Sequence, residues 1–348
     1  MLERNYIVWD LGATKCAAAL VRVRGDAYEI IATHSVKLKQ CDSLFEMAQT
    51  LHHALGVTPH DVDAICVGGA GQYNGEELIL ATPYPFPMRF AKVAAQQDWP
   101  VFFVVHDYTP IVCSTFLAHQ NKSQIRFLND AVADEHGRRV AFGVGTGLGV
   151  KDAVMLPTGE MWLGVNEMGH IGLTLPPKMN RVEASVHREF VRFYQEHDEL
   201  RGGAITFESV LSGKGLARIH QFIRGAKHRL TPEETAEEIK ATEDEETLRL
   251  FAWYLGLFIG TLQLTFMPTG GIWINGGVIN KNLELFDAPY LKKLFRGMQS
   301  CSAYLECRKQ QPLNVLVGQS HAYLGAAFYA HRCFPNKAPV CAEVAQAK

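Results

Sequence analysis

One aspartate in this chain, Asp107, follows a short apolar run and His106. The run, residues 101–105, reads Val-Phe-Phe-Val-Val, and bulky or β-branched residues of this kind predict a buried strand. In open α/β sheets, ligands bind beyond the carboxyl ends of the strands. Asp107 is therefore expected to present a carboxylate to a bound ligand. The alternative is a loop aspartate that caps the next helix.

Glycine-rich turns follow apolar strands at three other places: residues 10–14 (Asp-Leu-Gly-Ala-Thr), residues 143–149 (Gly-Val-Gly-Thr-Gly-Leu-Gly) and residues 275–277 (Asn-Gly-Gly). Glycine lets the backbone approach a ligand closely, and successive free N–H groups bind anions. The hydroxyls of Thr14 and Thr146 can add donors. A single turn of this kind is usually a plain hairpin, but three of them favour phosphate binding.

Asp10 stands beside the first of these turns. Mg²⁺ prefers one or two protein carboxylates together with phosphates and waters. Asp10 is therefore a candidate to hold Mg²⁺, directly or through water, against bridging phosphate oxygens. Two common nucleotide motifs are excluded, because Leu148 stands where the dinucleotide fingerprint needs glycine and Gly213-Lys214 lacks the Ser/Thr of a P-loop.

The elements around these residues start in a similar way in each half of the chain. Strands are predicted at 6–9 and 16–23 around the first turn, and at 139–142 and 150–156 around the second. Beyond residue 176 the pattern is mainly helical. The helices are predicted at 182–195, 206–211, 216–223, 231–241, 245–267 and 321–331, with strands at 271–275 and 313–317.

Composition narrows the class of protein. The chain has 348 residues, is 47% hydrophobic and carries a net charge of −2, so it has no electrostatic footprint for nucleic acid or an acidic membrane. Its eight cysteines form no C-x-x-C pair, which favours a reducing cytoplasm. The N-terminus has no signal-peptide pattern. The apolar stretch 251–267 predicts a helix buried in a large domain and not a membrane span.

Taken in order, the motifs resemble the bacterial glucokinase family of the actin-like/hexokinase superfamily of sugar kinases. The resemblance runs from Tyr6 to the final helix. The matching segments are Asp10-Leu11-Gly12-Ala13-Thr14, His106-Asp107-Tyr108-Thr109, Gly145-Thr146-Gly147-Leu148-Gly149, Glu167-Met168-Gly169-His170, Glu208-Ser209-Val210-Leu211-Ser212-Gly213-Lys214-Gly215-Leu216 and Asn275-Gly276-Gly277-Val278.

The resemblance implies an α/β fold of two RNase-H-like domains with an interdomain cleft. The expected boundaries are 1–109 plus about 319–335 for a small domain, 110–318 for a large domain with helical insertions, and 336–348 for a loose tail. It also implies ATP-dependent phosphorylation of a hexose, with glucose 6-phosphate as the expected product, Mg²⁺ as the metal, a cytoplasmic location and a homodimer.

Site roles follow from the same resemblance. Asp107 is the expected general base, which takes the proton of the attacking sugar hydroxyl. The expected sugar ligands are His106, Asp107, Glu167, His170, Glu208 and Thr82. The expected nucleotide contacts are Asp10, Gly12, Ala13, Thr14, Lys15, Gly145, Thr146, Gly147, Gly276 and Gly277.

Several positions depart from the family pattern. His106 replaces an asparagine, and Thr82-Pro83-Tyr84 replaces a segment with an asparagine amide. Ala13 replaces a glycine, and Lys15 stands at an asparagine position. These changes leave open a kinase for another hexose or an amino sugar, and a catalytically weak sugar sensor of the same fold.

Overall fold

The computed structural model describes residues 3–80, 84–173, 179–197, 205–225 and 230–334. The chain divides into two compact units, unit 1 with residues 1–125 and 318–348, and unit 2 with residues 126–317. Each unit has its own core of buried hydrophobic side chains. The division falls at residue 125 and not at the expected 109, and the expected loose tail lies outside the described residues.

Unit 1 is built on a five-stranded sheet with the order β3-β2-β1-β4-β7. Strands β1, β2 and β3 form an antiparallel meander, and β4 and β7 run parallel to β1. The strands are β1 (Glu3–Leu11), β2 (Lys15–Arg24), β3 (Ala27–Lys37), β4 (Ala64–Gly69) and β7 (Val101–His106), and β5 (Gln72–Tyr73) pairs separately with β6 (Leu78–Ile79).

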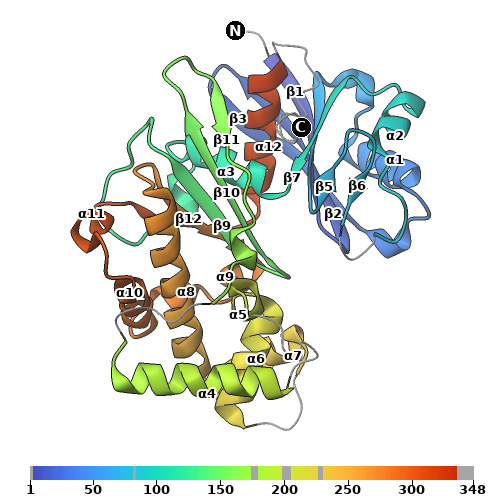
Figure 1. Cartoon of the computed structure of the whole chain (residues 1–348). Coiled ribbons are helices and arrows are strands. Elements are labelled where there is room, and N and C mark those ends of the chain that lie inside the picture. Colours follow the sequence, from blue (N-terminus) through green and yellow to red (C-terminus); the bar gives the residue numbers. More distant parts are fainter. Residues whose placement is uncertain (1–2, 81–83, 174–178, 198–204, 226–229, 335–348) are drawn as a thin grey trace. The chain divides into compact units, whose positions relative to one another are not determined.

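The helices of unit 1 come from both ends of the chain (Figure 1). They are α1 (Leu44–Leu55), α2 (Phe90–Gln96), α3 (Tyr108–Ser114) and α12 (Ser320–Cys333). The last helix, α12, packs against α3 and contacts β1 and β4. A Cβ atom at Gly325 would overlap the carbonyl of Pro110, so α12 and α3 touch backbone to backbone. This contact explains why α3 belongs to unit 1.

Unit 2 is built on a six-stranded sheet with the order β11-β10-β9-β12-β13-β8. Strands β9, β10 and β11 form an antiparallel meander, and β12 runs parallel to β9 and β13. The strands are β8 (Ile125–Phe127), β9 (Arg139–Val144), β10 (Leu148–Met155), β11 (Met161–Leu163), β12 (Gly271–Asn275) and β13 (Leu313–Leu316). The predicted similarity between the two halves is confirmed, since both sheets join a meander to parallel strands.

The remaining helices belong to unit 2. They are α4 (Arg181–His197), α5 (Phe207–Val210), α6 (Gly213–Arg224), α7 (Pro232–Thr242), α8 (Glu245–Phe266), α9 (Gly277–Lys281), α10 (Tyr290–Ser300) and α11 (Leu305–Lys309). A 3₁₀ turn at Met168–His170 lies against β10. The helices predicted from the sequence are therefore present, although the one expected over 206–211 is a single short turn.

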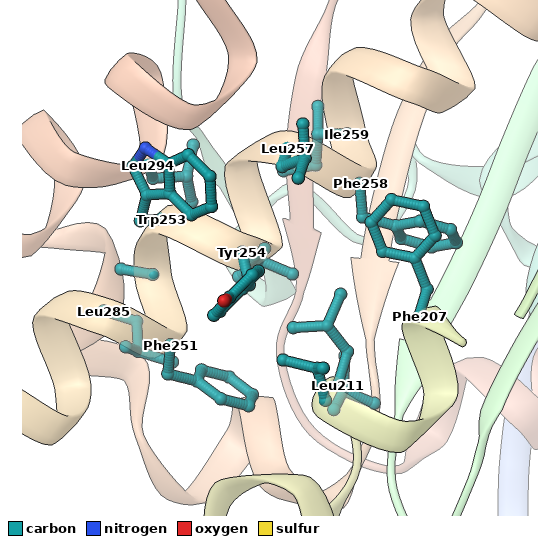
Figure 2. Close-up of a cluster of buried hydrophobic side chains, with 14 of the residues drawn as sticks. Phe207, Leu211, Phe251, Trp253, Tyr254, Leu257, Phe258, Ile259, Leu285 and Leu294 are labelled. Atoms are coloured by element: carbon teal, nitrogen blue, oxygen red, sulfur yellow. The ribbon is translucent and has the colours of Figure 1, made fainter. Parts of the chain in front are cut away.

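Helix α8 is the central core element of unit 2. It is long and apolar enough to cross a membrane, but 78% of its most apolar 18-residue window is buried inside the structure. Figure 2 shows Phe251, Tyr254 and Phe258 of this helix among side chains that include Phe207 and Leu211. The prediction of a buried helix from the stretch 251–267 is confirmed.

Candidate functional site

The first glycine turn joins β1 to β2 in unit 1. The N–H of Gly12 donates to the carbonyl of Lys15 at 3.0 Å, and the N–H of Leu38 donates to the carbonyl of Thr14 at 3.0 Å. The side chains of Ala13, Thr14 and Lys15 are exposed. The backbone of the turn is thus fixed while its outer side is open to solvent, which suits an anion-binding hairpin.

Asp107 lies between the last residue of β7 and the first residue of α3. Its N–H donates to the carbonyl of Gly69 at 3.0 Å, which extends the pairing of β7 with β4 by one residue. In the described helix α3, the Asp107 side chain makes no capping hydrogen bond. Helix capping, the alternative role for this carboxylate, therefore has no support in the structure.

Asp10 and Asp107 lie at the same edge of the unit 1 sheet. Strands β1, β4 and β7 are parallel neighbours, with Leu11 in register with Gly69 and Gly69 with His106. Their carboxyl ends therefore meet at one edge, as ligand-binding α/β sheets require. Glycines occupy the end of the middle strand, β4, so no long side chain separates the two aspartates there.

The environment of Asp10, including the negative charge of Asp107, changes the pKa of its carboxyl group. The protein atoms around the Asp10 carboxylate, together with the negative charge of Asp107, raise the pKa of Asp10 to about 6, while Lys15 acts in the opposite direction. The side chain nevertheless remains exposed. A divalent cation would neutralise this pair of like charges, so the carboxylate arrangement fits Mg²⁺.

The rest of the described chain offers little else to a metal. Among the residues with described positions, no group of three or more His, Cys, Asp or Glu side chains is arranged to hold a metal ion. A cation at Asp10 would therefore take its other ligands from phosphate oxygens and water, as Mg²⁺ commonly does.

His106 packs directly on the candidate base. Its Nδ1 atom lies 3.1 Å from Oδ1 of Asp107, and the N–H of Tyr108 donates to the same nitrogen at 3.3 Å. Both side chains are partly exposed, 24% for His106 and 29% for Asp107. The imidazole therefore contacts the carboxylate through the ring nitrogen nearer to the backbone. An asparagine at this position could make a hydrogen bond but could not carry a positive charge.

The segment expected to hold the sugar from unit 1 is described only in part. Thr82 and Pro83 lie outside the described residues. Tyr84 is described, and its hydroxyl donates to the carbonyl of Ala70 at 2.6 Å. Burial and the negative charge of Asp107 raise the pKa of Tyr84, so its phenol stays protonated at neutral pH.

The second glycine turn joins β9 to β10 in unit 2, and the predicted hairpin context is confirmed. The N–H of Gly145 donates to the carbonyl of Gly147 at 2.9 Å, and the N–H of Gly213 donates to the carbonyl of Gly145 at 2.8 Å. Thr146 is exposed at the tip. The bond from Gly213 therefore connects the start of helix α6 to this loop and restrains the loop backbone.

Glu167, His170 and Glu208 come together beside this loop. Nε2 of His170 lies 4.0 Å from Oε2 of Glu167, and Nδ1 of His170 lies 3.9 Å from Oε1 of Glu208. The segment from Glu167 to His170 forms a single 3₁₀ turn and not an α-helix. Two carboxylates and an imidazole at these separations can hydrogen-bond several neighbouring hydroxyl groups.

Glu208 has a further contact that the sequence did not reveal. Its Oε2 accepts a hydrogen bond of 2.9 Å from the N–H of Leu148, the residue after Gly147. The Glu208 side chain is 34% exposed, so it is not simply a solvated acid at a helix start. No local sequence pattern signals a bond between residues sixty positions apart.

The third glycine turn follows β12. Gly276 has φ = 113°, a value that L-residues rarely adopt, and a Cβ atom there would overlap the backbone of Val144. Asn275 pairs with Gly143 across the β9–β12 ladder. Gly277 begins α9, and an added Cβ would meet open space. The second and third turns therefore lie side by side at the end of the unit 2 sheet.

The chain is similar to known sugar kinases along nearly its whole length. The sequence model of the family described as Glucokinase matches residues 7–333. A glucokinase from Saccharophagus degradans is 28% identical over 337 residues, which cover 94% of this chain and 98% of that protein.

Solved structures agree with this match at the level of the fold. A glucokinase from Balamuthia mandrillaris in complex with glucose has a TM-score of 0.75 and 18% identity, covering 95% of this chain and 94% of that chain. A ROK family glucokinase from Streptomyces griseus in complex with glucose and AMPPNP has a TM-score of 0.58 and 19% identity, covering 94% and 99%. On the full-length family match, the chain belongs to the glucokinase family.

Proposed function

We propose that this protein transfers the γ-phosphoryl group of ATP to a hexose, with glucose as the expected substrate and its O6 hydroxyl as the acceptor. The observation that carries the proposal is Asp107, a carboxylate placed after β7 at the ligand edge of a sheet and not used to cap α3. Family membership over residues 7–333 supports the same conclusion.

In this proposal Asp107 is the general base. It accepts the proton of the sugar hydroxyl while that oxygen forms a bond to the γ-phosphorus and the bond from the γ-phosphorus to the bridging oxygen of ADP breaks. Phosphoryl transfer depends mostly on positioning and charge stabilisation, so one well-placed carboxylate is enough. His106 lies beside this carboxylate, with Nδ1 3.1 Å from Oδ1 of Asp107.

The glycine turns are proposed to bind the nucleotide. Gly12, Ala13, Thr14 and Lys15 offer N–H, hydroxyl and ammonium donors to phosphate oxygens. Within unit 2, residues 145–147 and 276–277 offer backbone donors of the same kind. Asp10 would hold Mg²⁺, directly or through water. Mg²⁺ bound there together with ATP would neutralise negative charge on the phosphates.

Glu167, His170 and Glu208 are proposed to bind the hydroxyl groups of the sugar, with His106 and Thr82 as further ligands. A site built from such polar groups discriminates sharply against the wrong epimer, because a missing hydroxyl leaves a partner unpaired. A kinase for another hexose or an amino sugar is the second candidate, and the observation that favours it is the imidazole of His106 against Asp107.

We propose that the two units are RNase-H-like domains of the sugar-kinase class, since both sheets share the same order of meander and parallel strands. The protein is further proposed to act in the cytoplasm, as a homodimer, without a nucleic-acid or membrane partner. Light scattering coupled to size-exclusion chromatography tests the dimer, and a monomeric mass would reject it.

The test of the function is coupled ADP release with Mg-ATP across a panel of hexoses and amino sugars. The wild type is expected to turn over glucose, and Asp107→Ala to lose at least about 100-fold in kcat, the scale of a general base. His106→Asn measures how far the imidazole sets sugar preference. Turnover that survives in Asp107→Ala would remove Asp107 as the base. Sugar binding without turnover in the wild type would instead support the sensor alternative.

A further inference from the structure

The backbone of Leu148 is the point where the sugar ligands and the second phosphate loop meet. Its N–H donates to Oε2 of Glu208 at 2.9 Å. Its carbonyl lies so close to Gly169 that a Cβ atom there would overlap it. Gly169 stands between Glu167 and His170 in the sequence. The backbone of this one residue is thus hydrogen-bonded to one proposed sugar ligand and packed against the turn that carries the other two.

From this junction we propose that Glu208 is a positioning residue for the nucleotide as well as a ligand of the sugar, and that it couples the two substrate sites. The inference rests on the proposed function for the identity of the substrates. The geometry itself lies wholly within unit 2.

The two oxygens of the Glu208 carboxylate face different sites. Oε2 holds the Leu148 amide, and Oε1 lies 3.9 Å from Nδ1 of His170. Hydrogen bonds to a carboxylate are roughly twice as strong as those between neutral groups. The loop between Val144 and Leu148 is short and closed by the bond from Gly145 to Gly147. Fixing the Leu148 amide therefore fixes the backbone donors that face a phosphate.

The fold of this region does not depend on the Glu208 carboxylate. Helix α5 begins with a capping box in which Thr206 and Ser209 exchange hydrogen bonds. Phe207 and Val210, the first and last residues of α5, are buried in the core. Variants at Glu208 are therefore expected to fold, and a change in nucleotide affinity can be read as a change in loop position.

The first test is calorimetric titration with Mg-ADP in the absence of sugar. Glu208→Ala is expected to weaken ADP binding about tenfold, because the Leu148 amide loses a charge-assisted bond. Glu208→Gln keeps a carbonyl acceptor for that amide, so its ADP affinity should remain within about threefold of the wild type. The control is Glu167→Ala, which removes a carboxylate from the same cluster and should leave ADP affinity unchanged.

The second test changes the phosphate loop and measures sugar binding, because coupling between two sites is reciprocal. A Cβ atom at Gly147 would lie 2.7 Å from Oε2 of Glu208, so Gly147→Ala must displace the end of this flexible side chain. Glucose binding without nucleotide should then weaken about fivefold, the lower end of usual coupling. Gly145→Ala is the matched control, because an added Cβ there meets open space.

Two results would overturn the coupling. One is wild-type ADP affinity in Glu208→Ala, and the other is equal glucose affinity in the two glycine variants. The failure of the proposed function looks different, since the wild type would then turn over no hexose. The ADP titrations still decide whether Glu208 positions the loop in that case.

Discussion

At the residue level, the site depends on two carboxylates whose negative charges act on each other. Asp10 and Asp107 share one sheet edge, and the pKa of Asp10 rises to about 6. The folded protein without metal thus holds Asp10 in its charged form at a cost when the pH exceeds 6. Such costs are typical of sites that are built to bind a cation or perform catalysis.

Asp10→Asn tests this cost. The folded-state pKa lies above the unfolded value of 3.8, so the destabilisation by ionised Asp10 begins near pH 3.8, grows as the pH rises and is complete above pH 6. Without Mg²⁺ at pH 7.5, the variant should be more stable by ~1 kcal/mol, a figure reduced for the exposed side chain. Urea unfolding at pH 7.5 and pH 4 measures it. Equal stability of the two proteins at pH 7.5 would contradict the assignment.

At the scale of the element, a buried histidine ties α1 to the unit 1 sheet. His52 is 4% exposed and packs against Trp9 and Trp99 with ring centroids 5.9 and 5.7 Å away. Burial lowers the pKa of His52 to about 4. Its Nε2 atom has no hydrogen-bond partner among the described residues. Protonation of this ring therefore opposes the packing of α1.

We expect this histidine to make unit 1 sensitive to acid. The folded-state pKa lies below the unfolded value of 6.5, so the unfolded chain binds the proton first and stability is lost as the pH falls from 6.5 towards 4. The full effect is about 3 kcal/mol. His52→Phe should flatten the stability difference between pH 7 and pH 4.5 in urea unfolding, whereas the exposed neighbour variant His53→Gln should keep the wild-type slope. A wild-type slope in His52→Phe would reject the role of this ring.

The strands and long helices were largely predictable, but the short elements were not. Periodic apolar patterns and caps, such as Thr231 before Pro232, mark their own helices. Helix α3 contains Pro110 and β-branched residues, so its local preference is weak and burial against α12 decides its form. Helix α10 packs against α8, where Gly256 of α8 and Gly297 of α10 let the two backbones touch. No local sequence pattern reveals this contact.

At the scale of the whole molecule, the end of the chain completes the unit that holds the candidate base. Helix α12 packs against α3, which begins directly after Asp107. Gly325 of α12 and Pro110 of α3 are in contact although more than two hundred positions separate them. The position of Asp107 therefore depends on a helix from the opposite end of the sequence.

Gly325→Val tests this dependence. The added side chain would meet the Pro110 carbonyl, and overpacking of this kind costs about 1–3 kcal/mol or more. Urea unfolding should show this loss, and kcat should fall because α3 shifts. Gly325→Ala should lie between the wild type and the valine variant. A valine variant with unchanged stability would show that the two helices can separate without cost.

The strand–turn–strand units, the apolar helices and the ordered family motifs can all be recognised in the sequence, because each depends on residues close together along the chain. Only the tertiary structure decided which distant groups meet. It placed Asp10 and Asp107 at one edge through parallel pairing with β4, and it bonded Glu208 to the Leu148 amide. Such contacts arise when packed elements bury their apolar faces together, and that packing has no signature in any single segment.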